Sequence, residues 1–338
     1  MKVLCFTIFL FIFTLNISSQ DFLVSSCDNL SGSWKIFKKK EFYYDSLNNQ
    51  EVILTFGWND IKNEFFPKIK EVEYLVSKEC KLNYSFNWSF EKQEFEKSSN
   101  GLEYYDSLGN LVLEFFDQLD EASIFGPRNL IKTQLYNNNN KIIETVLKKK
   151  KINDSDYLNY EQIIFIYNSG GKLIIQHRNS WDVKNNMWIN LNRKCLDYFI
   201  DGSEKSSLYQ EWDKVNQIWV NATLIENYED TLELDYSFEL EKKWQENDWV
   251  IDSKVLYNYD KNGNCIEINN YEWDKNKNYW NLSFKTNRIY NIFNNMVKSY
   301  SCKWNEEIKQ FENTIMLEYN YDLLGKTISQ IEYFWKKI

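Results

Sequence analysis

Hydrophobic and polar residues alternate singly along most of the chain, and this alternation predicts β-strands. In the segment 280–287, for example, Trp280, Leu282, Phe284 and Thr286 alternate with polar or charged residues. A period of two places successive side chains on opposite faces of a strand, so that one face packs while the other meets water. We therefore expect half-buried antiparallel strands throughout, with Trp280 to Thr286 sharing one face.

One segment departs from this alternation and is the best candidate for a helix. It runs from Asn140 to Lys151 and ends in the basic run Lys148–Lys151. Because a run of like charges repels itself, we expect these lysines to lie on a solvated edge or in a loop.

Tryptophan recurs at a nearly constant interval. In the carboxyl-terminal half the spacings are 31, 32, 29, 31 and 31 residues by subtraction. The residues concerned are Trp181, Trp212, Trp244, Trp273, Trp304 and Trp335. Trp58, Trp88 and Phe116 continue the register toward the amino terminus, and only the stretch around Leu147 lacks its aromatic residue. A fixed period of this length is typical of a tandem structural repeat.

A second aromatic residue follows most of these positions after seven residues. The pairs are Trp58 with Phe65, Trp88 with Phe95, Trp181 with Trp188, Trp212 with Trp219, Trp273 with Trp280, and Trp304 with Phe311. Trp249 follows Trp244 after five residues, which indicates a shorter loop. We expect each pair to face across the two strands of a hairpin, where such a pair contributes about 0.2–1 kcal/mol.

Glycine is scarce, with 10 in the whole chain, and four glycines share one position in the repeat. They are Gly109, Gly171, Gly263 and Gly325, separated by 62, 92 and 62 residues. Three of them follow a Tyr-Asp dipeptide, as in Tyr105-Asp106-Ser107-Leu108-Gly109. A tight turn needs residues that tolerate positive φ, and an Asp side chain can tie the loop by hydrogen bonds. The pattern thus predicts that each unit consists of a strand, a tight turn, a second strand and a wider loop.

About ten such units fit between Ser33 and the carboxyl end, which predicts roughly 20 strands. Strand twist prevents so many strands from forming a flat sheet. The predicted fold class is all-β: an elongated, curled antiparallel β-meander of two-stranded repeats, solenoid-like or partly rolled. No Pro-rich or Gly-rich linker divides it, so we expect residues 21–338 to form a single domain.

Residues 1–20 have the pattern of a secretory signal peptide. Lys2 precedes an apolar run from Val3 to Phe13, which is too short to span a bilayer. A buried core helix is the alternative, but no polar face accompanies the run. Cleavage near Ser19 or Gln20 would give a secreted, periplasmic or surface protein without a transmembrane segment.

Five cysteines would remain after cleavage. They are Cys27, Cys80, Cys195, Cys265 and Cys302. Their spacing gives no CxxC pair and no disulfide framework, so we expect small buried side chains. Val24-Ser25-Ser26-Cys27 resembles a lipobox that would place a lipid anchor on Cys27, although Asp21 and a polar spacer separate it from the apolar run.

Charge and composition exclude several kinds of function. The chain has 40 Lys or Arg and 49 Asp or Glu, for a net charge of −9, which argues against nucleic acid as a partner. A single histidine, His177, excludes multi-histidine metal sites and His-based relays. We expect it to face solvent on a strand. Acidic pairs such as Glu71 and Glu73 are common, but no spacing selects a general acid and base. We predict no catalytic residue and no cofactor.

Three aspartates recur at one position of the wide loop with Asn nearby: Asp182, Asp213 and Asp274. Such oxygens could bind Ca²⁺. The alternative is an Asx turn closed by hydrogen bonds to the backbone, which we favour because no bidentate glutamate follows at the spacing of an EF-hand. No metal site is predicted.

The sequence Tyr-Asp-x-x-Gly-Asn, at 105–110 and 259–264, resembles the YD repeats of Rhs-type bacterial secreted and surface proteins. The longer unit, with Trp181-Asp182 followed by Trp188 and Asn190, is similar to tandem arrays in exported proteins of Bacteroidetes. The resemblance covers nearly all of residues 21–338 and implies a β-sheet scaffold without catalytic residues of its own.

Three functions stay open on the sequence alone. Repeat arrays usually bind, so we predict a non-catalytic exported scaffold for an extracellular or cell-surface protein or glycan. The first alternative is a secreted carbohydrate-active hydrolase that uses carboxylates in a groove of the sheet. The second is a passive stalk or spacer.

Overall fold

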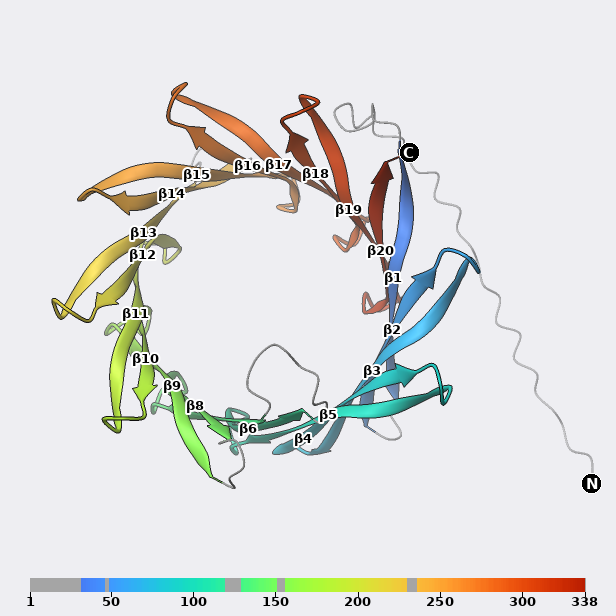
Figure 1. Ribbon diagram of the computed structural model, residues 1–338, viewed down its shortest axis with the longest axis horizontal. Coiled ribbons are helices and arrows are strands. Elements are labelled where there is room, and N and C mark those ends of the chain that lie inside the picture. Colours follow the sequence, from blue (N-terminus) through green and yellow to red (C-terminus); the bar gives the residue numbers. More distant parts are fainter. Residues whose placement is uncertain (1–31, 46–48, 119–128, 151–155, 230–235, 338) are drawn as a thin grey trace, which may run out of the picture.

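The computed structural model describes residues 32–45, 49–118, 129–150, 156–229 and 236–337 (Figure 1). In these residues the chain forms 20 strands and no helix. The strands are β1 (Gly32–Asp45), β2 (Gln50–Asn59), β3 (Glu64–Ser77), β4 (Cys80–Ser89), β5 (Glu94–Tyr105), β6 (Leu111–Gln118), β7 (Asn129–Tyr136), β8 (Ile142–Lys150), β9 (Tyr157–Tyr167), β10 (Leu173–Asp182), β11 (Met187–Tyr198), β12 (Glu204–Asp213), β13 (Ile218–Glu229), β14 (Tyr236–Gln245), β15 (Asp248–Tyr259), β16 (Cys265–Asp274), β17 (Tyr279–Tyr290), β18 (Met296–Asn305), β19 (Gln310–Tyr321) and β20 (Thr327–Lys337).

Every strand pairs antiparallel with its neighbours in sequence, and β20 also pairs with β1. The sheet therefore closes into a ring, or closed barrel (Figure 1). The predicted all-β antiparallel meander of two-stranded units is confirmed. The curled sheet is a closed ring and not the expected elongated, solenoid-like or partly rolled form, because twist that accumulates over so many strands brings the last strand back to the first. Closure also gives both terminal strands a hydrogen-bonded neighbour.

The predicted helix at 140–151 is not formed by the residues that the structure describes there. The residues Ile142–Lys150 form β8, which pairs with β7 on one side and β9 on the other. Lys148 and Lys149 thus lie in an interior strand rather than on an edge or in a loop. The β-branched residues Ile142, Thr145 and Val146 favour this pairing over helix.

The ring is closed by an antiparallel pair of strands, β1 and β20, that come from opposite ends of the chain. Trp335 of β20 lies opposite Trp34 of β1, with ring centroids 5.1 Å apart in an edge-to-face arrangement. Lys38 and Glu332 form an ion pair of 2.7 Å across the same two strands. The other tryptophans of the register each have an aromatic partner five or seven residues later in the chain. For Trp335 that partner is Trp34, from the other end of the chain.

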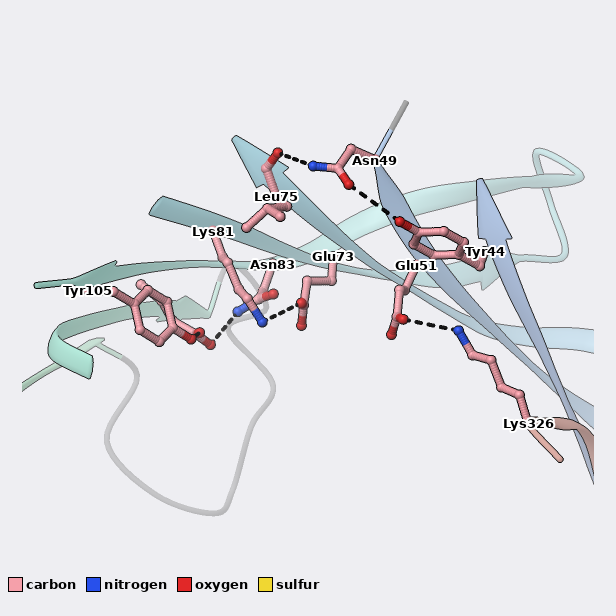
Figure 2. Close-up of polar contacts among 10 residues, drawn as sticks. Tyr44, Asn49, Glu51, Glu73, Leu75, Lys81, Asn83, Tyr105 and Lys326 are labelled. Carbon is pink, nitrogen blue, oxygen red and sulfur yellow. Dashed lines mark hydrogen bonds and ion pairs between the residues drawn. The ribbon is translucent and has the colours of Figure 1, made fainter. Parts of the chain in front are cut away.

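A second contact ties the turn before β20 to the first strands. Lys326 reaches Glu51 of β2 at 3.2 Å, and its ammonium lies 4.8 Å from the ring centroid of Tyr44 in β1 (Figure 2). Asn49 donates a hydrogen bond of 3.1 Å to the carbonyl of Leu75, which links the start of β2 to the end of β3. The two ends of the array are thereby joined on the side of the tight turns as well.

Most of the wide-loop hairpins contain a β-bulge, whereas the described residues of β6–β7 pair without one. In the β16–β17 hairpin Tyr271 lies opposite Leu282 while Asn270 lies opposite Phe284, so Ser283 is an extra residue. The same irregularity recurs in the hairpins β2–β3, β4–β5, β8–β9, β10–β11, β12–β13, β14–β15 and β18–β19, and between β20 and β1. A bulge bends its strand and increases the local twist, and Figure 1 shows these hairpins projecting outward from the ring.

The bulge changes which residues share a face. We call the face with the tryptophan pairs the aromatic face, and the other one the opposite face. Beyond the bulge Lys285, not Phe284, continues the face of Trp280, because Lys285 lies opposite Asn269. The prediction that Trp280 to Thr286 share one face is therefore wrong from Phe284 onward.

We predict that Trp34 and Trp335 stabilise the protein together and not separately. In a double-mutant cycle with Trp34→Ala and Trp335→Ala, the coupling free energy of unfolding should be about 0.5–1.5 kcal/mol, the range for edge-to-face aromatic pairs. Urea denaturation measures it. Trp34→Ala combined with Trp181→Ala is the control and should be additive within about 0.5 kcal/mol, since these rings share no partner. Additivity of the first pair would contradict closure through this contact.

Candidate functional site

The predicted aromatic pairs form as expected. Trp58–Phe65, Trp88–Phe95, Trp181–Trp188, Trp212–Trp219, Trp244–Trp249, Trp273–Trp280 and Trp304–Phe311 are all cross-strand partners. Their ring centroids are 4.8–5.2 Å apart, with interplanar angles of 63–74°. Edge-to-face packing uses the positive edge of one ring against the negative face of the other. These rings are half-buried against each other, which gives them a structural role.

The predicted turn glycines also have the expected conformation. Gly109, Gly171, Gly263 and Gly325 have φ between 77° and 83°. At Asp106 the carboxylate accepts hydrogen bonds from the backbone N–H of Leu108 and Asn110, both at 2.9 Å. Asn140 and Asn294 take the glycine position in two other turns, with φ of 62° and 61°. Asn there replaces glycine because it tolerates the left-handed conformation better than most residues.

The sequence interpretation missed a row of tyrosines that connects neighbouring turns. Tyr136, Tyr167, Tyr198, Tyr290 and Tyr321 each donate a hydrogen bond to the carbonyl 25 residues earlier, at 2.7–3.0 Å. Their spacings are 31, 31, 92 and 31 residues by subtraction, as regular as those of the tryptophans. That regularity was visible in the sequence, but the carbonyl partner depends on the register of adjacent hairpins.

The loop aspartates form Asx turns, as favoured above. The carboxylate of Asp182 accepts hydrogen bonds from the backbone N–H of Lys184 and Asn185, and Asp213 and Asp274 have the same arrangement. Hydrogen bonds, first from the side chain of Asn185, hold the pKa of Asp182 below its usual value. Over the described ranges no three His, Cys, Asp or Glu side chains gather as a metal site would require.

His177 does not simply face solvent. It is half-buried on the aromatic face, where its ring lies 5.0 Å from that of Trp219 and its Nε2 lies 3.1 Å from Asn190 Oδ1. Burial lowers the pKa of His177. The prediction failed because the hairpin tryptophan extends over neighbouring strands and covers the histidine. The thiols of Cys80, Cys195 and Cys265 are free.

A first candidate binding surface lies on the rim formed by the tight turns. We call it the rim patch, made of Ile292 and Phe293 in the β17–β18 turn and Leu323 and Leu324 in the β19–β20 turn. Their exposed fractions are 91%, 75%, 105% and 93%. The two turns are adjacent because β18 pairs with β19. A hollow of about 590 Å³ beside them is lined in part by Phe293, Leu323, Leu324 and Tyr319.

A second candidate surface is a hollow of about 670 Å³ over β10 to β14. We call it the strand pocket. It is lined mainly by residues of the opposite face: Gln176, Arg178, Asn192, Lys194, Tyr209, Glu211, Thr223, Ile225 and Glu241, with Arg193, Gln210 and Ala222 beside the bulges. Small-molecule sites span about 300–1,000 Å³. The pocket combines an aromatic ring, amides, cations and carboxylates.

Over the residues described, nothing helical is present that could cross a membrane. The predicted signal peptide, residues 1–20, and the lipid anchor considered at Cys27 lie outside the described residues. Export of the chain therefore stays a prediction from the sequence.

No family model matches the chain, and no curated protein is similar to it. Among solved structures, a protein of the DUF3836 family from Bacteroides vulgatus matches with 17% identity and a TM-score of 0.24, over 28% of this chain and 90% of its own. A protein of unknown function from Bacteroides fragilis has 20% identity and a TM-score of 0.29, over 36% and 89%. A DUF3836 protein from Parabacteroides distasonis has 24% identity and a TM-score of 0.23, over 28% and 91%. Likeness at this level carries no information on function, and the resemblance to YD repeats stays a prediction.

The tyrosines predict a loss of stability at alkaline pH. Burial first, and a neighbouring carboxylate second, raise the pKa of Tyr257 and of Tyr333 to about 12. The carboxylates are Glu239, at 3.2 Å from the hydroxyl of Tyr257, and Glu318, at 2.8 Å from that of Tyr333. Between about pH 10, where free tyrosine titrates, and about pH 12, the unfolded chain loses these protons while the folded chain keeps them.

Stability should therefore fall over this window, and the fall should be shallower for the double variant Tyr257→Phe, Tyr333→Phe. Urea midpoints measured against pH test this. The control is Tyr279→Phe, which changes an exposed tyrosine at a wide loop. Equal slopes for the wild type and the double variant would show that these hydroxyls do not titrate as described.

Proposed function

We propose that this protein is an exported, non-catalytic scaffold that binds an extracellular protein through the rim patch. The observation that carries the proposal is the exposure of four large apolar side chains, Ile292, Phe293, Leu323 and Leu324, on two adjacent turns. Apolar side chains that gather on a surface rimmed by polar residues are typical of protein–protein contact.

The rim patch stands on a backbone that is already fixed. In the β19–β20 turn, Asp322 accepts hydrogen bonds from the backbone N–H of Leu324 at 2.9 Å and of Lys326 at 2.8 Å. In the neighbouring turn Asn291 accepts from the N–H of Phe293 at 2.9 Å. A surface that is ordered before binding loses little conformational entropy on association. Most of the free energy gained by burying the apolar side chains of the rim patch can therefore contribute to affinity.

Adjacent turns are also held relative to each other. The hydroxyl of Tyr321 donates a hydrogen bond of 2.7 Å to the carbonyl of Met296, the first residue after the β17–β18 turn. The four apolar side chains consequently form one surface rather than two independent tips. Such a surface suits a partner with a complementary apolar cluster.

Binding by a variant with a polar rim tests this function. The rim variant combines Ile292→Ser, Phe293→Ser, Leu323→Ser and Leu324→Ser. Full burial of one such side chain is worth about 1.5–3 kcal/mol, and each 1.4 kcal/mol is tenfold in affinity. A partner isolated with the wild-type protein from the exported proteins of the same cells, and then purified, should bind the rim variant at least about tenfold more weakly.

The matched control replaces exposed apolar residues on the other rim, with Ile61→Ser, Val183→Ser and Val215→Ser. Its affinity should equal that of the wild type. Equal binding of the partner by all three proteins would contradict the proposal, and so would the failure of every purified exported protein to bind the wild type. Unchanged urea midpoints of both variants confirm that folding is intact.

A further inference from the structure

We propose that the strand pocket is a binding site for a neutral oligosaccharide. The pocket lies on β10 to β14 and shares no residue with the rim patch. The inference therefore goes beyond the proposed function and does not depend on it.

Comparison of the repeats with one another shows that this pocket is specialised. The comparison uses the position three residues before the first aromatic of each wide hairpin. It is occupied by Thr55, Ser85, Asn270 and Ser301 in the hairpins β2–β3, β4–β5, β16–β17 and β18–β19, and by the apolar Leu113 in β6–β7. The hairpin β8–β9 lacks the aromatic residue, and there Leu147 has the same place beside the bulge. In the three consecutive hairpins that form the pocket the position is occupied by Arg178, Tyr209 and Glu241. Between β20 and β1, where the ring closes, the position is occupied by Glu332, which forms an ion pair with Lys38.

Small residues at this position satisfy the repeat in four hairpins, so a large polar side chain there is not needed for the fold. Thr55 is buried beside its bulge. Arg178, Tyr209 and Glu241 instead reach into one hollow from three neighbouring units. Departures from the repeat that converge in space are the expected trace of a binding site placed on a repetitive scaffold.

The polar groups of the pocket are held in place before any ligand arrives. Arg178 pairs with Glu161 at 2.5 Å. Arg193 donates a hydrogen bond of 2.7 Å to Gln210, and its guanidinium lies 4.6 Å from the ring centroid of Trp219. A set of donors and acceptors with fixed positions binds a ligand with little further ordering.

The charges of the pocket favour a neutral ligand. Its cations are Arg178, Arg193 and Lys194, and its carboxylates are Glu211 and Glu241. The ion-pair partners of the lining residues are Glu161, Glu204 and Lys243. Cations and carboxylates in this group are equal in number. A phosphate or a polyanion would meet carboxylates here, whereas hydroxyl groups can donate to the carboxylates and accept from the cations and amides.

The aromatic ring of the pocket suits the apolar face of a sugar ring. Tyr209 is 38% exposed, and Lys194 lies 5.4 Å from its ring centroid. An exposed tyrosine offers a large, rigid contact area at small entropic cost. An extended peptide is a weaker candidate, because peptides that lie along a sheet add to a free edge, and the described strands leave none free where the ring closes.

The test uses six soluble tetrasaccharides as probes: maltotetraose, cellotetraose, xylotetraose, mannotetraose, chitotetraose and tetragalacturonate. Saturation-transfer NMR detects binding, and titration gives Kd. We expect at least one of the five neutral probes to bind with a submillimolar Kd, and Tyr209→Ser to weaken that binding at least about tenfold. Glu211→Gln should also weaken it, because an amide accepts hydrogen bonds less strongly than a carboxylate.

Tyr209→Ser gives its hairpin the residue type found at Ser85 and Ser301, so folding should be preserved. Asn270→Ser makes the same kind of change outside the pocket and should leave the Kd unchanged. Binding of none of the neutral probes, preference for tetragalacturonate, or equal loss in Asn270→Ser would overturn the proposal. Release of reducing ends by the wild type, abolished in Glu211→Gln, would also overturn it in favour of a hydrolase. The rim variant should bind the sugar as the wild type does, which separates the two proposals.

Discussion

The edge-to-face aromatic pair that crosses most of the wide hairpins is the interaction on which the rest of this structure depends. Few side chains are buried in the described residues, and Val72, Cys302 and Met316 are the apolar ones. A sheet with so thin a core needs stabilisation that is local and repeated. Most wide hairpins supply it through their own pair of rings, their bulge and their backbone ladder. The pair of Trp34 and Trp335 repeats this contact between the two ends of the chain.

Two different rims follow from this arrangement. The bulges bend the wide hairpins outward, while the tight turns are held by Asp or Asn side chains and by tyrosine hydroxyls from the neighbouring unit (Figure 1). Between the first Asp or Asn of the turn and the Gly or Asn that ends it, the residues enter these bonds only through their backbone, so their side chains are free to vary from unit to unit. Leu323 and Ile292 occupy such positions. The scaffold thus separates the residues that maintain it from the residues that can acquire a function.

The sequence was sufficient for several features whose partners are close in the chain. The aromatic pairs, the Gly109 turn and the Asx turn at Asp182 each depend on a few consecutive residues, and all of them form as predicted. Closure of the ring could not be predicted, because Trp34 and Trp335 meet only after the twist of all intervening strands has accumulated. The bulge was missed because a spacing of seven residues between paired aromatics says nothing about the register beyond them.

The same limit applies to the candidate sites. Arg178, Tyr209 and Glu241 were ordinary polar residues in the sequence, and only the register of β10 to β14 shows that they share one hollow. The covering of His177 by Trp219 likewise depends on a residue three strands away. The exposed pair Leu323 and Leu324 stands in a turn that the sequence did predict, but their neighbours Ile292 and Phe293 needed the pairing of β18 with β19.

Amide hydrogen exchange of β1 and β20 tests the central claim, closure of the ring, most directly. In a closed ring the amides of these strands pair with each other, as at Lys40 opposite Gln330. Their protection should then lie within about tenfold of that of equivalent amides in β12 and β13. Exchange in β1 and β20 several orders of magnitude faster, as at the edges of an open sheet, would contradict the account.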